Sequence, residues 1–132
     1  MKVLRYILSI LAGLVLGSIV NMAIVMLSGH IIPLPEGVDM TNLQEGIRLF
    51  EPKHFIMPFL AHALGTLVGA FIATLISKDH RLLMAMIVGL LFLAGGIINV
   101  LQLNAPLWFN ALDLIAAYLP MAWAGYGIAA KI

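Results

Sequence analysis

Apolar residues occur along this chain in four long runs, and each run is long enough to cross a membrane. The runs occupy about residues 4–28, 52–77, 82–101 and 111–130. About 20 apolar residues, rising 1.5 Å each, cross a hydrocarbon core of roughly 30 Å. The first run is too long for the apolar core of a signal peptide, so we expect an uncleaved span. The pattern predicts an all-α polytopic membrane protein with a single four-helix transmembrane domain.

Local signals predict where these helices begin and end. Gly29 follows Ser28 at the end of the first run and is the expected left-handed C-cap. Pro52 suits the first turn of the second helix. Asn110 precedes the fourth run by one residue and has the side chain of an N-cap.

The hydrophilic stretch 29–51 separates the first two spans. Thr41 and Gln44 have the spacing of a capping box at the start of a helix. Apolar residues follow at helical spacing, at Leu43, Ile47 and Phe50. This pattern predicts a short external amphipathic helix, which either lies in the membrane interface or covers the mouth of the bundle as a lid.

Composition supports a membrane protein and excludes several other classes. Of the 132 residues, 63% are hydrophobic and 10% are charged, and the mean hydropathy is +1.10. Soluble domains carry about 25% charged residues, so this chain cannot cover a water-facing surface. A net charge of +1 without a basic stripe excludes nucleic acid as a partner. The sequence has no cysteine, which excludes disulfides, thiol chemistry and Cys-ligated metals.

Lysine and arginine are divided unequally between the two faces of the predicted bundle. With four spans, the face that carries both termini has Lys2, Arg5, Lys78, Arg81 and Lys131, whereas the opposite face has Arg48 and Lys53. Because cytoplasmic loops are enriched in Lys and Arg, we expect both termini in the cytoplasm. The location that we expect is a bacterial inner membrane.

Small residues form a stripe along each span. In the first two spans they recur every four residues, at Ser9, Gly13 and Gly17 and at Ala61, Gly65, Gly69 and Ala73. In lipid, such stripes let helix backbones approach closely. The stripes indicate tight packing within the subunit or across an oligomer interface, and we expect a homo-oligomer.

Polar side chains within the spans gather in the half of the membrane opposite the termini. Asn21 and Asn99 lie near the outer ends of their spans, and His62 and Asp113 near the outer beginnings of theirs. An ionisable group that faces acyl chains costs at least about 2.5–3.5 kcal/mol at mid-depth. We therefore expect these four side chains to wall a polar cavity that opens to the outside. Four further residues are expected near its rim: Thr66, Asn104, Trp108 and Asn110.

His62 is the expected proton acceptor or ligand-binding group of this cavity, with Asp113 as its charge partner. The reference pKa of histidine, about 6.5, lies in the physiological range. Each residue also has a structural explanation. Asp113 can complement the positive end of the fourth helix, Asn21 can bond across helices, and Asn99 can reach interfacial water. His62 can be a single histidine satisfied within the bundle.

Aromatic residues near the span ends are typical of interfacial anchors. Trp108 and Tyr118 can take that role rather than stack on a ligand, and Trp123 and Tyr126 fit a second aromatic belt on the inner side better.

Three functions remain open. The first is binding or transport of a small solute or ion through His62 and Asp113. The second is an accessory subunit whose outer segment docks a membrane partner protein. The third is an enzyme that acts on a lipid or quinone with His62 as base. Because neither a nucleophile nor a metal set accompanies His62 in the sequence, the third is the least favoured. We put the first function forward, with the accessory subunit as its alternative, and expect no cofactor.

Overall fold

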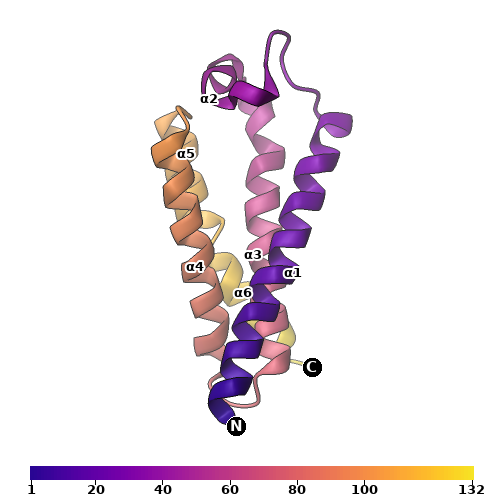
Figure 1. The fold of residues 1–132 in the computed structure, drawn as a ribbon, viewed down its shortest axis with the longest axis vertical. Coiled ribbons are helices and arrows are strands. Elements are labelled where there is room, and N and C mark those ends of the chain that lie inside the picture. Colours follow the sequence, from indigo (N-terminus) through magenta and orange to yellow (C-terminus); the bar gives the residue numbers. More distant parts are fainter.

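The computed structural model describes residues 1–132, with the side chain of Met40 excepted. Its helices run between the two ends of a bundle, as Figure 1 shows. They are α1 (Lys2–Ile31), α3 (Ile56–Ile76) with the 3₁₀ turn Pro52–Phe55 before it, α4 (Arg81–Gln102), α5 (Leu107–Ala116) and α6 (Leu119–Ala129). Four helical segments are long and apolar enough to cross a membrane, the fourth being α5 and α6 together. The predicted class, an all-α polytopic membrane protein, is confirmed.

Both termini lie at one end of the bundle, which we call the terminal end (Figure 1). Residues 32–51 lie at the opposite end, the loop end. At the terminal end, two arginines bind backbone carbonyls near the end of α3. Arg5 Nε donates to the Ile76 oxygen over 2.7 Å, and Arg81 Nε donates to the Thr74 oxygen over 3.0 Å. These bonds supply partners for carbonyls that a helix end leaves free.

The small-residue stripes of the first two spans pack on each other within the subunit. A Cβ built on Gly13 would lie 2.5 Å from the Gly69 oxygen, and one built on Gly17 would lie 2.5 Å from the Gly65 oxygen. Real side chains do not approach backbone oxygen so closely. Glycine at these positions therefore sets the distance between α1 and α3.

Helix α1 contacts α4 near the terminal end, and the two helices diverge toward the loop end. Tyr6, Ile10 and Leu14 pack against a buried cluster that contains Met84 and Val88 of α4. Figure 1 shows α1 leaning away from α4 beyond this point. The bundle is thus closed by apolar packing at the terminal end, whereas α1 and α4 separate near the loop end.

The fourth span is broken in its middle, contrary to the single helix expected over residues 111–130. α5 ends at Ala116 and α6 begins at Leu119, while Tyr118 has φ −112° and ψ −80°, outside the helical region. Pro120 has no N–H to bond the Ala116 carbonyl, and its ring disfavours helix in the residue before it. The missing N–H leaves the Ala116 carbonyl without its helical partner, and the helix is interrupted between Ala116 and Leu119.

Three expected helix ends are wrong. α1 passes through Gly29 and ends at Ile31, because a glycine costs a helix only about 1 kcal/mol while unpaired backbone in lipid costs more. Asn110 is not an N-cap: α5 begins after Pro106, and the Asn110 amide donates to the Ala105 oxygen.

The capping box expected at Thr41 and Gln44 is the third wrong helix end, because none of the helix starts described has it. Instead, the Asp39 carboxylate accepts bonds from Thr41 over 2.9 and 2.7 Å, which lowers the pKa of Asp39.

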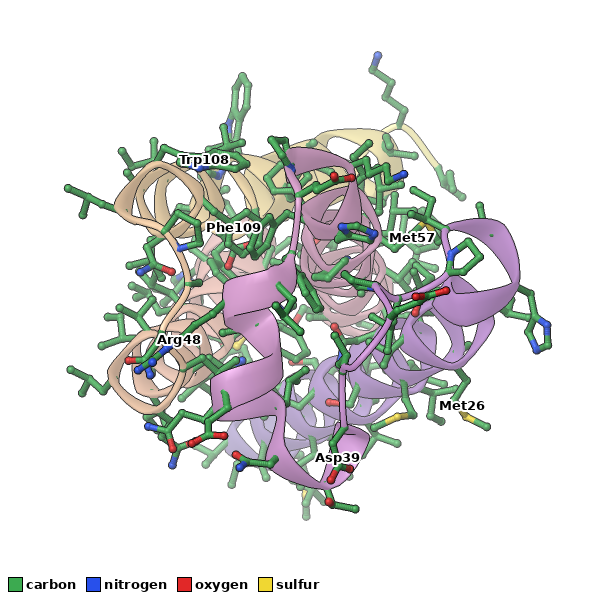
Figure 2. The ribbon with its side chains drawn as sticks, turned by 90° about the horizontal axis from the view of Figure 1, so that it is seen from above. Met26, Asp39, Arg48, Met57, Trp108 and Phe109 are labelled. Atoms are coloured by element: carbon green, nitrogen blue, oxygen red, sulfur yellow. The ribbon has the colours of Figure 1, made fainter. Side chains whose placement is uncertain are left out.

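Residues 40–49 form three short helical turns in place of one continuous amphipathic helix. These turns are Met40–Asn42, α2 (Leu43–Gly46) and Ile47–Leu49. Gly46 lies in their middle, and glycine is a poor helix former. Ile47 is buried against Phe55 and Phe109, so the segment is held over the loop end of the bundle. Figure 2 shows this segment, between the labels Asp39 and Arg48, crossing that end. We call residues 38–50 the roof.

Candidate functional site

His62, Asp113 and Tyr118 form a hydrogen-bonded cluster inside the bundle. Nδ1–H of His62 donates to the Asp113 carboxylate, 2.8 Å from Oδ1 and 3.0 Å from Oδ2. The Tyr118 hydroxyl donates to Oδ2 over 3.3 Å. The rings of His62 and Tyr118 stack at 23° with centroids 5.9 Å apart. Asp113 is 4% exposed, and two donors compensate the burial of its carboxylate.

The bond to Asp113 fixes the chemistry of the imidazole. With the proton held on Nδ1, the other ring nitrogen, Nε2, carries a lone pair. The hydrogen bonds described for His62 all use Nδ1, and the side chain is 20% exposed. Nε2 can therefore accept a bond from a hydroxyl when the ring is neutral, and donate one to a carbonyl when the ring is protonated.

The break in the fourth span brings Tyr118 to Asp113. In an unbroken helix, residues five positions apart point about 140° apart around the axis, so their side chains cannot bond each other. The non-helical backbone at Tyr118 removes this restriction. Gly96 of α4 makes the necessary room, since a Cβ there would lie 2.5 Å from the Tyr118 hydroxyl oxygen.

Tyr118 is a residue of the site that the sequence analysis missed. It is 3% exposed, so its assignment as an interfacial anchor is wrong. Pro120, two residues further along, was the available signal. A proline in the middle of a span marks a place where the helix bends or breaks, and where a side chain can leave its regular direction.

A main cavity of about 320 Å³ lies between the roof and the His62–Asp113 pair. Most of its lining is apolar, and Ile47 and Phe50 of the roof contribute to it. Its polar lining within the spans comes from α1, the 3₁₀ turn Pro52–Phe55, α3, α4 and α5. These polar residues are Asn21, Ser28, His54, His62, Asn99, Asn110 and Asp113.

A side hollow of about 310 Å³ adjoins the main cavity and lies between α1 and α4, with α3 behind it. Its lining comprises Ser18, Asn21, His62, Gly65, Thr66, Phe92, Gly95, Gly96, Asn99 and Tyr118. Four residues line both spaces: Asn21, His62, Gly96 and Asn99. We call the polar residues among these four, Asn21, His62 and Asn99, the polar floor of the main cavity. The same residues form the inner wall of the side hollow.

The structure brings the four expected wall residues to one cavity, because Asn21, His62, Asn99 and Asp113 all line the main cavity. Asp113 lies in the second turn of α5 and bonds to His62, so it does not act as a partner for the helix N-terminus. That these four residues bind a ligand stays a prediction.

Two of the expected rim residues lie elsewhere. Thr66 is 1% exposed and lines the side hollow, and its hydroxyl has no hydrogen-bond partner among the residues described. Trp108 is 48% exposed and lines a separate apolar groove. Figure 2 shows Trp108 at the outer edge of the bundle and Phe109 nearer its middle. Because α5 begins at Leu107 rather than at residue 111, Phe109 takes the inward position.

The remaining two rim residues divide between the cavity and the surface. Asn110 lines the main cavity, whereas Asn104 is exposed and is not part of the lining described. The main cavity is thus lined by three asparagine side chains, those of Asn21, Asn99 and Asn110.

The described residues contain no group of three or more His, Cys, Asp or Glu side chains that could hold a metal ion. Comparison with protein-family models, with curated proteins and with solved structures finds no match for this chain. What the site can do follows from its own chemistry. It offers one oriented imidazole nitrogen and several amides to a hydrogen-bonding group, inside a cavity whose other walls are apolar.

Proposed function

We propose that this integral membrane protein binds and transports a small molecule, which contacts His62 on the floor of the main cavity. The observation that carries the proposal is the orientation of the imidazole. Asp113 holds Nδ1 at 2.8 Å and leaves Nε2 for a ligand, beside a cavity of about 320 Å³. Cavities that bind small molecules range from about 300 to 1,000 Å³.

Two features of the spans support a functional site over a purely structural one. Ionisable residues inside a membrane are costly and as a rule mark ligand or proton pathways, and here two of them are paired. The fourth span is interrupted at Tyr118, beside the same pair. Broken helices at membrane depth occur where the irregular backbone is buried in protein or lines a cavity, as in many transporters.

The distribution of positive charge supports an orientation for this activity. Five Lys and Arg side chains on the face with the termini and two on the opposite face favour cytoplasmic termini. The main cavity then lies in the outer half of the membrane, under a roof on the external side. A bacterial inner membrane and a homo-oligomer belong to the same proposal.

The accessory-subunit alternative loses one of its supports. Leu43, Ile47 and Phe50 were the apolar residues available to dock a partner protein. All three line the main cavity, and Ile47 is 6% exposed. A partner at the roof would therefore have to bind the residues between them, which are polar apart from residues such as Leu49, 50% exposed.

Native mass spectrometry tests the proposal, because it detects a bound molecule of any identity by its mass. The protein is extracted with its surrounding lipid into nanodiscs, and the mass of any retained small molecule is measured. The wild type is expected to retain one molecule per chain. His62→Gln replaces the ring by a single amide, which cannot bond Asp113 at the position of Nδ1 and a ligand at the position of Nε2 at the same time. We expect its occupancy to fall at least about tenfold, as for a lost hydrogen bond of roughly 1.5 kcal/mol.

His30→Gln provides the matched control, because His30 is exposed at the end of α1 and outside the cavity lining. It is expected to retain the molecule as the wild type does. An empty wild-type protein, or equal occupancy in His62→Gln, contradicts the proposal. Chemical conversion of the retained molecule by the wild type would identify the enzyme alternative.

A further inference from the structure

Apolar side chains line the main cavity between the roof and its polar floor. Phe55 and Phe109 are buried together with Ile47. The ring centroids of Phe55 and Phe109 are 4.5 Å apart. Phe50 of the roof packs on Phe55 at 5.2 Å. A water-soluble ligand that came from this end would have to leave water and cross this cluster before it reached His62.

The side hollow offers a second route, at the depth of the membrane. Three residues on its lining are exposed: Ser18 of α1 and Gly95 and Asn99 of α4. We call the gap that they border the window. A Cβ built on Gly95 would have no heavy atom within 4 Å, so the gap is open at this point. The window leads to Asn21 and His62, which line both the side hollow and the main cavity.

Asn99 makes the window chemically unusual for a lipid-facing surface. Polar side chains in spans normally face the bundle interior or a water-filled cavity, yet Asn99 is exposed on α4. Asn99 lies three residues before the end of α4, where interfacial water can form a hydrogen bond to its amide. A molecule that passes through the window with a polar head would provide one in place of water.

The outer face of α1 beside the window is apolar. A shallow groove there is lined by Leu14, Val15, Ser18, Ile19 and Met22. Ser18 also lines the side hollow, so the groove continues from the window. In a membrane this groove contacts hydrocarbon. It therefore suits the hydrocarbon part of a molecule whose polar part lies inside the window.

The charges of the lining define the polar part of such a molecule. Among the described residues that line the main cavity and the side hollow, there is neither lysine nor arginine. The carboxylate of Asp113 is already paired with His62 and would repel a second anion. Amides and an imidazole nitrogen instead suit a neutral group that accepts or donates hydrogen bonds, such as a carbonyl or a hydroxyl.

We propose that the ligand is a neutral amphiphile dissolved in the membrane. It enters between α1 and α4 through the window, its carbonyl or hydroxyl binds Nε2 of His62, and its hydrocarbon chain remains in the groove on α1. This inference rests on the proposed function, because it identifies the class of ligand and the path by which that ligand reaches the same site.

Photo-crosslinking with two matched probes tests the class of ligand. One probe is a long-chain alcohol with a diazirine in its chain, and the other is the carboxylic acid of the same chain. Each is added to the protein in lipid nanodiscs, and the labelled residues are mapped by mass spectrometry. The alcohol is expected to label the groove and the window, and excess unlabelled alcohol is expected to displace it. The acid is expected to label at least about fivefold less, because Asp113 disfavours an anion.

A pair of glycine substitutions tests the path. Gly95→Phe places a ring in the window, and Gly127→Phe places one on α6 away from it. Neither built Cβ meets a heavy atom within 4 Å, so both variants are expected to fold, as thermal unfolding will check. Gly95→Phe is expected to reduce the saturable alcohol labelling to background, whereas Gly127→Phe leaves it unchanged.

Equal labelling by the acid, or full labelling of Gly95→Phe, would overturn the inference. The retained molecule in native mass spectrometry separates this failure from that of the proposed function. If Gly95→Phe retains it and His62→Gln loses it, the ligand comes from the loop end, and only the path through the window is wrong. If the wild type retains nothing, the proposed function fails as well.

Discussion

At the scale of single residues, two buried threonines of α3 differ in one respect. The Thr74 hydroxyl donates to the Ala70 oxygen over 2.8 Å, the usual way in which a helix satisfies threonine. The Thr66 hydroxyl has no partner among the residues described, although Thr66 is 1% exposed. An unsatisfied buried hydroxyl costs about 1–3 kcal/mol. The hydroxyl of Thr66 therefore does not stabilise the folded chain.

Thr66→Val is expected to stabilise the ligand-free protein by about 1 kcal/mol, because valine keeps the shape of threonine and removes the unsatisfied hydroxyl. Thermal unfolding in detergent, followed by circular dichroism, measures the change. Thr74→Val is the matched control, since it removes a hydroxyl that is already satisfied, and it is expected to give no stabilisation. A loss of stability in Thr66→Val equal to that in Thr74→Val would contradict this account.

The residues of the site could be predicted in part. The depth of Asn21, His62, Asn99 and Asp113 along their spans was readable from the sequence, and depth alone placed them in one half of the membrane. The contact between His62 and Asp113 needs the rotation of each helix as well, which the sequence only suggests. Tyr118 could not be placed, because its position depends on the broken backbone beside it.

At the scale of helices, the four spans follow directly from the sequence because charged turns and prolines interrupt the apolar runs. The break in the fourth span does not, since a mid-span proline is compatible with a bend as well as with a break. The sequence pattern also did not predict that α5 begins at Leu107, about four residues before the expected start of the span. Trp108 is therefore part of the helix, and it lies on its outer face.

The packing of α1 on α3 is the contact that fixes the shape of the bundle, and Gly17→Leu tests it. The built Cβ at Gly17 lies 2.5 Å from the Gly65 oxygen, so a larger side chain must push the two helices apart. Overpacking of this kind costs about 1–3 kcal/mol or more. Gly29→Leu, on the same helix but with open space at its Cβ, is expected to keep or raise the thermal midpoint, because glycine costs a helix about 1 kcal/mol. Equal midpoints for the two variants would contradict the close approach.

At the scale of the whole molecule, the two ends of the bundle have different designs. Apolar packing and arginine–carbonyl bonds close the terminal end, whereas α1 and α4 separate near the loop end and leave two adjoining spaces there. The roof crosses the loop end above the main cavity (Figure 2), and the side hollow lies between α1 and α4. In the proposed function, this asymmetry would give a membrane-borne molecule access to buried polar groups without opening the opposite end.

An experimental density map of the wild-type protein in lipid nanodiscs tests the central claim most directly, because it shows whether His62 contacts a bound molecule. Non-protein density is expected within hydrogen-bond distance of Nε2 of His62, with Asp113 on the opposite side of the ring. A map in which α1 packs against α4 along its whole length, with no space beside His62 for a ligand, would contradict it.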